Sequence, residues 1–333
     1  MKLRKSNFII LIVITSLVLY FSLKDEFFDI VMQIRKANIF FILLALFSLL
    51  LYWMIEAKTL QLMVFPFKKD LKYKKILKNT IITQFFHGIT PFATGGQPAQ
   101  IYLLTTEGIP AVSASNASVQ NFIVYQLVLV LLGAFALIYN WITGLFNEIA
   151  LLDKLTIIGF LINFLVIASL LTITFFPRFN SFLINGIINI FAKLNFIKNK
   201  EKHIKRWRKR NQEFYENAFE LRHNKELAIK SFILNILKLT LFYLIPVFLF
   251  YSVGIMNVSP IKVIVASAYV ALISAFIPLP GGSGGAEYSF IAFFGVLVKG
   301  YQLAAIMLLW RFITYYFGLF LGGLTLVLTN KKR

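Results

Sequence analysis

The sequence contains no cysteine and has few charged residues, especially acidic ones. The missing cysteines exclude a disulfide framework, a thiolate metal site and a cysteine nucleophile. Charged residues make up 14% of the 333 residues and hydrophobic residues 59%, whereas soluble domains have about 25% and about 45–50%. This composition excludes an ordinary water-soluble enzyme, a disordered protein and a free nucleic-acid binder. Together with a mean hydropathy of +0.76, it indicates a membrane protein with several spans.

Apolar runs long enough to cross a bilayer, roughly 20 residues each, occur at six places: 8–23, 38–57, 115–140, 155–176, 229–251 and 301–329. The first run follows a basic start and could be read as a signal peptide, but no small-residue cleavage site follows it. We therefore expect six full transmembrane helices in an all-α polytopic membrane protein.

Positive charge is concentrated outside these spans. The chain has 34 Lys and Arg against 14 Asp and Glu, a net charge of +20. All but two of these net charges lie in four segments: 1–6, 66–79, 177–228 and 331–333. Because cytoplasmic loops are enriched in Lys and Arg, we expect these segments and both termini to be cytoplasmic, in a protein of the cell membrane.

Two further segments, 80–112 and 259–298, must each return to the face from which they enter. Otherwise the number of crossings would place basic loops on both sides of the membrane. Both segments contain Gly and Pro breaks, which favour re-entrant hairpins over pairs of short complete crossings. The charge pattern predicts that the two hairpins enter from opposite faces.

The hairpins share the pattern P-x3-G-x3-A-[QE], which begins at Pro91 and Pro278, a constant offset of 187. The flanking spans follow the same order. The chain is therefore predicted to be a single membrane domain with two inverted repeats, about 38–140 and 229–329, joined by the cytoplasmic loop 177–228. Paired broken segments in an inverted repeat are typical of a transporter's central site. The alternative is two unrelated Gly/Pro breaks.

Polar groups inside the hydrocarbon region are costly unless they are paired or hydrated, so each is a candidate for function. The hairpins contain eight such substrate-binding candidates: Gly95, Gly96, Gln97, Gln100, Gly282, Gly284, Gly285 and Glu287. Helices that start near Pro98 and Gly285 would direct unpaired N–H groups at a phosphate oxygen.

Arg311 and Lys238 are predicted to lie near mid-membrane, and they complete the candidate binding site. Each could instead form a structural pair with Glu287 or with backbone carbonyl groups. Glu56 is interpreted as a solvated group where the second helix meets the cytoplasm. Glu107, at the mouth of the first hairpin, is ambiguous.

Other chemistry has little support. The run Gly281–Gly285 lacks the Lys-Ser/Thr of a nucleotide-binding loop, and the three histidines have no metal-ligand spacing. We expect no catalytic residue, metal or cofactor. The basic stretch 198–210 predicts an amphipathic helix on anionic lipid headgroups, with an RNA contact as the less favoured alternative.

The segments T-P-F-A-T-G-G-Q-P-A-Q-I-Y (90–102) and P-L-P-G-G-S-G-G-A-E-Y (278–288) resemble the two signature segments of the flippase-like transmembrane family. This family includes the membrane domain of lysylphosphatidylglycerol synthases, the multiple peptide resistance factors. The resemblance covers essentially the whole chain. It implies movement of phospholipid, phosphatidylglycerol or its aminoacylated form, between leaflets, which contributes to resistance against cationic peptides.

Full-length synthases also carry a large soluble transferase domain, and the longest hydrophilic segment here, 177–228, is too short for one. We therefore expect a lipid flippase or scramblase rather than an enzyme, with a membrane phospholipid as its substrate. A separate lipid-modifying enzyme is a further candidate partner. The alternative is a transporter or scaffold for a polyprenyl-linked or other glycolipid intermediate.

Overall fold

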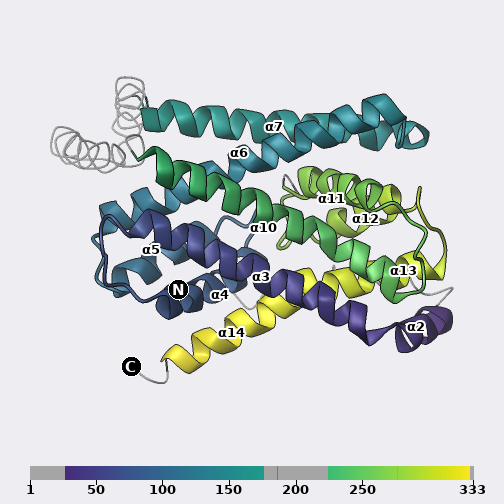
Figure 1. The fold of residues 1–333 in the computed structure, drawn as a ribbon, viewed down its shortest axis with the longest axis horizontal. Helices are drawn as coiled ribbons and strands as arrows, with labels where there is room; N and C mark the ends of the chain where they lie inside the picture. Colours follow the sequence, from purple (N-terminus) through teal and green to yellow (C-terminus); the bar gives the residue numbers. More distant parts are fainter. Residues whose placement is uncertain (1–26, 176–185, 187–223, 276, 331–333) are drawn as a thin grey trace, which may run out of the picture.

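A computed structural model describes residues 27–175, 186, 224–275 and 277–330, and these residues form helices and connecting turns with no β-strand (Figure 1). The predicted all-α class is confirmed for this part of the chain. The predicted span 8–23 and the basic stretch 198–210 lie outside the described residues.

Five helical segments of the described chain are long and apolar enough to cross a membrane, and they correspond to five of the six predicted spans. Their elements are α3 (Ile39–Val64), α6 (Ala111–Thr143), α7 (Ala150–Phe175), α10 (Lys225–Ser252) and the continuous run α13 (Tyr301–Arg311), η2 (Phe312–Tyr316, a π-helix) and α14 (Phe317–Asn330). The side chains of Asn38 and Asn224 accept backbone N–H groups at the starts of α3 and α10, which fixes where these two helices begin.

The remaining helices are shorter: α2 (Phe27–Lys36), α4 (Tyr73–Ile89), α5 (Gly96–Thr106), the 3-10 turn η1 (Asn147–Ile149), α11 (Pro260–Ser274) and α12 (Gly285–Phe294). At about 1.5 Å per residue, none of them reaches the roughly 30 Å of a hydrocarbon core. Helices α4 and α5 pack together as hairpin 1, and α11 and α12 pack together as hairpin 2. The two hairpins lie toward opposite ends of the molecule in Figure 1.

The base of hairpin 1 is held by charges. Glu107, just after α5, pairs with Lys75 in the first turn of α4 at 2.7 Å, and Lys68 Nζ donates to the Glu107 carbonyl at 2.9 Å. The chain therefore leaves α5 beside the point where it entered α4. Glu107, whose role was ambiguous in the sequence, therefore joins the two ends of hairpin 1.

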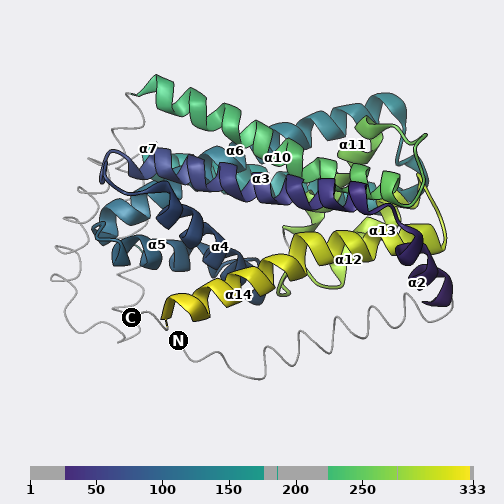
Figure 2. The ribbon, with the colours of Figure 1, turned by 60° about the horizontal axis from the view of Figure 1, so that its bottom comes forward.

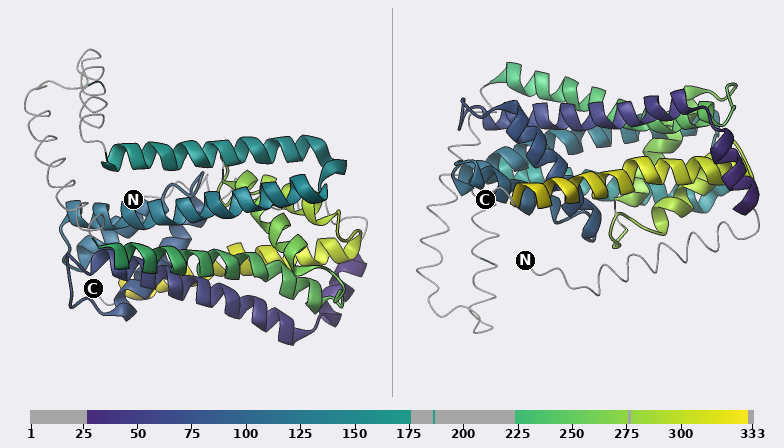
Figure 3. Two further views of the ribbon diagram at one scale, coloured as in Figure 1. Left: turned by 45° about the horizontal axis from the view of Figure 1, so that its top comes forward. Right: turned by 90° about the horizontal axis from the view of Figure 1, so that it is seen from below.

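The helix order long, short, short, long occurs twice, as α3–α6 (the first half) and as α10–α14 (the second half). Helices α3 and α10 pack along each other in antiparallel directions, because Asn38 N donates to Ser252 O at 2.8 Å where one begins and the other ends. Helix α4 packs on α14, and α11 packs on α6, so the first helix of each hairpin contacts the last helix of the other half (Figures 2 and 3).

The outer faces of the long helices are apolar. Exposed side chains gather on α3, α6, α7 and α14, and they include Phe47, Phe135, Leu161, Leu165 and Phe320. Since backbone groups in a helix bond internally, such faces suit contact with lipid chains. The polar side chains described below are inside the bundle.

Candidate functional site

The two helix breaks meet inside the bundle. Pro91 of the first tip (90–95) and Pro280 of the second tip (279–284) pair in an isolated antiparallel β-bridge. The first tip separates α4 from α5, and the second lies between α11 and α12. The two hairpins therefore approach from opposite ends and touch tip to tip.

The tips share a pair of left-handed residues, although their last residues differ, with φ −77° at Gly95 and +86° at Gly284. Each contains two successive residues with positive φ: Phe92 (53°) and Ala93 (54°) in the first tip, and Gly281 (61°) and Gly282 (64°) in the second. Residues with a side chain rarely adopt this left-handed conformation, whereas glycine adopts it readily. One turn is thus built from two different sequences, and the first tip carries more steric strain.

Hydrogen bonds fix the equivalence between the tips. Thr94 Oγ1 donates to Pro91 O, and Ser283 Oγ donates to Pro280 O, both at 2.9 Å. Equivalent residues are therefore 189 positions apart. The offset of 187 expected from the sequence pattern is two residues short, because the shared Pro, Gly and Ala letters do not follow the positive-φ pair.

Helix α5 begins at Gly96, two residues before the expected start near Pro98, and α12 begins at Gly285 as expected. Pro98 is accommodated in the first turn, where its missing N–H is no loss. Four of the five candidate glycine N–H groups are already hydrogen-bonded and are not free for a phosphate oxygen. Gly95 N donates to Thr90 Oγ1 at 2.8 Å, Gly96 N to Ala93 O at 3.3 Å, Gly282 N to Leu279 O at 2.9 Å and Gly284 N to Glu287.

The second tip is held by Arg311 and Glu287. Arg311 Nε donates to Glu287 Oε1 at 2.6 Å, while Gly284 N donates to Glu287 Oε2 at 2.7 Å. Arg311 Nη2 also donates to Gly281 O at 3.0 Å and lies 3.4 Å from Ser283 Oγ. Both charged side chains are buried. The structural pair between Arg311 and Glu287, which was the alternative to a binding role, is present, and it ties α13 to the tip.

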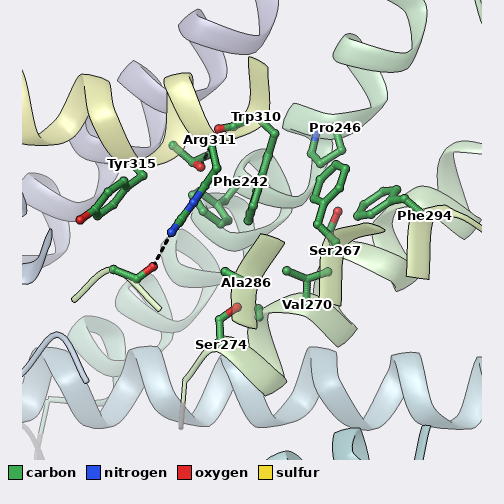
Figure 4. Close-up of a pocket in the computed structure, with 14 residues that line it drawn as sticks. Phe242, Pro246, Ser267, Val270, Ser274, Ala286, Phe294, Trp310, Arg311 and Tyr315 are labelled. Atoms are coloured by element: carbon green, nitrogen blue, oxygen red, sulfur yellow. Dashed lines mark hydrogen bonds between the residues drawn. The ribbon is translucent and has the colours of Figure 1, made fainter. Parts of the chain in front are cut away.

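Arg311 also borders a cavity of about 200 Å³ beside hairpin 2, shown in Figure 4. Because this cavity belongs to the second half of the chain, it is named the second cavity. The Arg311 guanidinium carbon lies 4.5 Å from the centre of the Tyr315 ring, a cation–π geometry. Tyr315 belongs to the π-helix η2, and its hydroxyl donates to Gly88 O in hairpin 1 at 3.1 Å. Single π-turns within α-helices are frequent at functional sites, and this one connects the two hairpins.

Two more cavities lie next to the second cavity around the tips. The tip cavity, about 250 Å³, shares Ser274, Gly281 and Tyr315 with it. The first cavity, about 710 Å³, shares His87 and Phe92 with the tip cavity. The three cavities therefore adjoin in a row that passes the Pro91–Pro280 contact.

The first cavity is rich in neutral polar groups. It is bordered by six side-chain amides: Gln84, Gln97, Gln100, Asn121, Gln126 and Asn163. Four aromatic side chains also border it: Tyr52, Phe92, Phe122 and Tyr125. Its size is within the range of about 300–1,000 Å³ typical of small-ligand sites.

A second buried ion pair borders the first cavity. Lys238 Nζ of α10 bonds Glu56 Oε2 of α3, and Asn121 Nδ2 donates to Glu56 Oε1 at 2.8 Å. The Lys238 ammonium lies 4.7 Å from the Tyr125 ring centre and 5.6 Å from that of Tyr52. Lys238 is fully buried, whereas the Glu56 side chain is 15% exposed. Glu56 therefore borders the cavity, and Lys238 lies behind it.

The interpretation of Glu56 as a solvated interface group is wrong. The second span was expected to end at 57, but α3 continues to Val64, which leaves Glu56 about two turns inside the helix. The polar side chains of Lys58, Thr59 and Gln61 lower the hydropathy of these last turns and conceal the helix in the sequence. Lys238 accordingly pairs with Glu56 and not with Glu287.

The other predicted residues are divided among the cavities. Gly96, Gln97 and Gln100 border the first cavity, Gly282 borders the tip cavity and Arg311 borders the second cavity. Gly95, Gly284, Gly285, Glu287 and Lys238 lie beside the cavities without bordering them.

Sequence reasoning missed the polar face that α6 presents to the first cavity. Ser118, Asn121 and Gln126 all border it, together with His87 of α4, whose Nδ1 lies 2.9 Å from Ala93 O. The signal that could have identified the α6 residues is the occurrence of several polar side chains inside one apolar span. No cluster of three or more His, Asp or Glu side chains in the described chain could hold a metal ion.

Comparison with known proteins agrees with this architecture. The family described as the lysylphosphatidylglycerol synthase TM region matches residues 8–322. The chain is also 23% identical over 312 residues to a UPF0104 membrane protein of Archaeoglobus fulgidus, which covers 88% of this chain and 87% of that protein. A match over nearly the whole length, with five membrane-length helices in the described residues, makes this a multi-pass membrane protein that belongs to the lysylphosphatidylglycerol synthase TM region family.

Proposed function

We propose that this protein moves phospholipid between the two leaflets of a membrane, as a flippase or scramblase. The proposed substrate is phosphatidylglycerol or its aminoacylated form, in keeping with the lipid named in the family description. The protein itself would perform no chemistry on the lipid, and a separate enzyme would supply any modified headgroup.

The observation that carries this proposal is the row of three cavities across the hairpin tips. A headgroup that crosses a membrane must exchange water for protein partners. The cavities offer amide groups on one side of the tips and the Arg311 guanidinium on the other, inside helices whose outer faces are apolar. The acyl chains would remain in the surrounding lipid while the headgroup travels through the bundle.

Passage from the first cavity to the second requires the tips to separate at Pro91 and Pro280. The tips are short connections between short helices. Their separation would break the Tyr315–Gly88 bond without unfolding a long helix. The proposal therefore includes a closed state with the tips in contact and an open state with the tips apart.

A glycolipid or polyprenyl-linked sugar is the second candidate substrate, because the six amides of the first cavity suit a hydroxyl-rich headgroup. The same assay serves both candidates. Purified protein is placed in liposomes that contain a lipid with a fluorescent acyl chain, and dithionite is added to bleach the label in the outer leaflet.

With active protein, we expect bleaching to proceed beyond the outer-leaflet fraction, because inner-leaflet lipid reaches the outside. Liposomes without protein provide the baseline. Bleaching that stops at the outer leaflet for every phospholipid and glycolipid headgroup would contradict the proposal.

A further inference from the structure

We propose that the first cavity binds the uncharged, hydroxyl-bearing part of a lipid headgroup, such as a glycerol or a sugar. This inference rests on the proposed function and deepens it, because it names the group that the cavity recognises. It does not depend on the direction or the driving force of lipid movement.

The lining of the cavity matches hydroxyl groups better than ionic groups. An amide side chain offers both a donor and an acceptor, as a hydroxyl does, whereas a phosphate only accepts and an ammonium only donates. Of the six amides, Gln126 and Asn163 already bond each other at 2.7 Å between α6 and α7. Gln97 and Gln100, which follow the first tip, project from the start of α5 and border the same space.

Two residues that border the cavity each have a buried polar atom without a partner. Within the described part of the chain, Ser118 Oγ neither donates nor accepts a hydrogen bond, and Asn121 Oδ1 accepts none. Both residues border the cavity, and they are 2% and 4% exposed. They are three residues apart on α6, so they lie on the same face of that helix. A buried polar atom without a partner is costly, and one ligand hydroxyl could serve both, donating to Asn121 and accepting from Ser118.

The charges at the cavity wall decide against an ionic ligand at this position. The Glu56 carboxylate would repel a phosphate, and the Asn121 oxygen could not bond to one. An ammonium group would compete with Lys238, which already fills the place beside Glu56 and over the two tyrosine rings. A neutral hydroxyl group meets neither obstacle.

Aromatic rings complete the match. Phe92, Phe122 and Tyr125 border the cavity and offer apolar surface to the carbon skeleton of a glycerol or sugar. The phosphate of a phospholipid would then lie toward the tip cavity, which shares His87 and Phe92 among its lining residues with the first cavity.

The test compares two lipids with the same charge. Phosphatidylglycerol carries two headgroup hydroxyls, and phosphatidylpropanol carries none. Binding of each lipid to the purified protein in detergent micelles is measured by native mass spectrometry, which requires no transport. A neutral glycosyl diacylglycerol forms a third arm that separates a glycerol-preferring site from a sugar-preferring one.

The variant Ser118→Ala removes one unpaired hydroxyl from the cavity wall. Ser231→Ala is the matched control, because Ser231 Oγ is likewise buried and without a partner in the described residues but does not border the cavity. We expect the wild type to prefer the hydroxyl-bearing lipids about tenfold, which corresponds to about 1.4 kcal/mol. Ser118→Ala should lose most of this preference, and Ser231→Ala should keep it.

Equal binding of phosphatidylglycerol, glycosyl diacylglycerol and phosphatidylpropanol by the wild type would overturn the inference, as would an unchanged preference in Ser118→Ala. Both results would mean that the unpaired atoms bind only water. Selective binding without lipid movement in liposomes would support the hydroxyl site and refute the proposed transport function. Lipid movement without selective binding would support the proposed transport function and refute the hydroxyl site.

Discussion

Glu56 of α3 and Lys238 of α10 form a buried ion pair between the first long helices of the two halves, although 182 positions separate them in the sequence. Asn121 donates to the carboxylate, and the rings of Tyr52 and Tyr125 flank the ammonium. A buried charge without its partner is far less stable than a buried pair. The pair therefore fixes how the two halves fit together beside the first cavity.

Removing one partner of this pair should destabilise the protein strongly. We expect Glu56→Gln to lower the free energy of unfolding by about 3–5 kcal/mol, because it leaves the fully buried Lys238 without a counter-charge. Lys238→Met should cost less, because the Glu56 side chain that it leaves unpaired is 15% exposed at the cavity. The double variant should lose clearly less than the sum of the two single losses. Thermal unfolding in detergent measures this, and a strictly additive loss would show that the two side chains do not depend on each other.

Arg311→Lys should impair lipid movement more than folding. Lysine keeps the charge beside Glu287 but lacks the planar fork that also reaches Gly281 O, so the second tip loses its link to α13. Losing one charge-assisted hydrogen bond costs about 1.5–3 kcal/mol, and we expect roughly tenfold or greater slowing in the liposome assay.

Arg311→Ala should abolish lipid movement. Measuring the yield of folded protein for Arg311→Ala, and for its combination with Glu287→Ala, gives the control. If the single variant does not fold and the double variant is restored in both folding and transport, the pair has only a structural role.

Gly281→Ala should disturb the tips more than Gly254→Ala does. Both glycines have positive φ, +61° and +90°, so both changes introduce strain of about 1–2 kcal/mol. Only at Gly281 would the new methyl group also lie 2.1 Å from the Tyr315 ring, whereas no atom lies within 4 Å at Gly254. We expect a clearly larger fall in the melting temperature for Gly281→Ala than for Gly254→Ala, and altered transport for Gly281→Ala only. Equal melting temperatures for the two variants would mean that the contact between Tyr315 and the tip is unimportant.

The cysteine-free chain allows a direct test of the predicted orientation in the membrane. Single cysteines at Leu145 and Met256 should react with a membrane-impermeant maleimide added to intact cells, and a cysteine at Lys205 should react only after the membrane is permeabilised. This pattern follows from the concentration of basic residues in the predicted cytoplasmic loops. Labelling of Leu145→Cys only after permeabilisation would reverse the predicted orientation.

The sequence was sufficient to predict the all-α membrane class, five of the long helices and the position of both helix breaks. These features depend on local hydropathy and on Gly and Pro, which act over a few residues. The broken segment 91–100 includes all but the first residue of the first tip, and the segment 278–287 includes the whole second tip. Glycine and proline located both segments, because they determine where a helix can continue.

The features that the sequence did not reveal depend on contacts between distant segments. Glu56 is concealed by the polar end of its own helix, and its partner Lys238 lies in the other half of the chain. The equivalence of the tips was two residues off because Phe92 and Ala93 adopt a backbone conformation that favours glycine. Residue letters alone do not indicate that conformation.

The proposed route through the tips can be tested by locking them together. A β-bridge places its Cα atoms about 4.5–5.5 Å apart, within the range that a disulfide accepts, so Pro91→Cys and Pro280→Cys combined should cross-link in a chain that has no other cysteine. The two single-cysteine variants control for loss of the prolines. In liposomes, we expect the oxidised double variant to move no lipid and to regain movement when the disulfide is reduced. Lipid movement at the single-variant rate with the cross-link intact would show that headgroups do not pass between the tips.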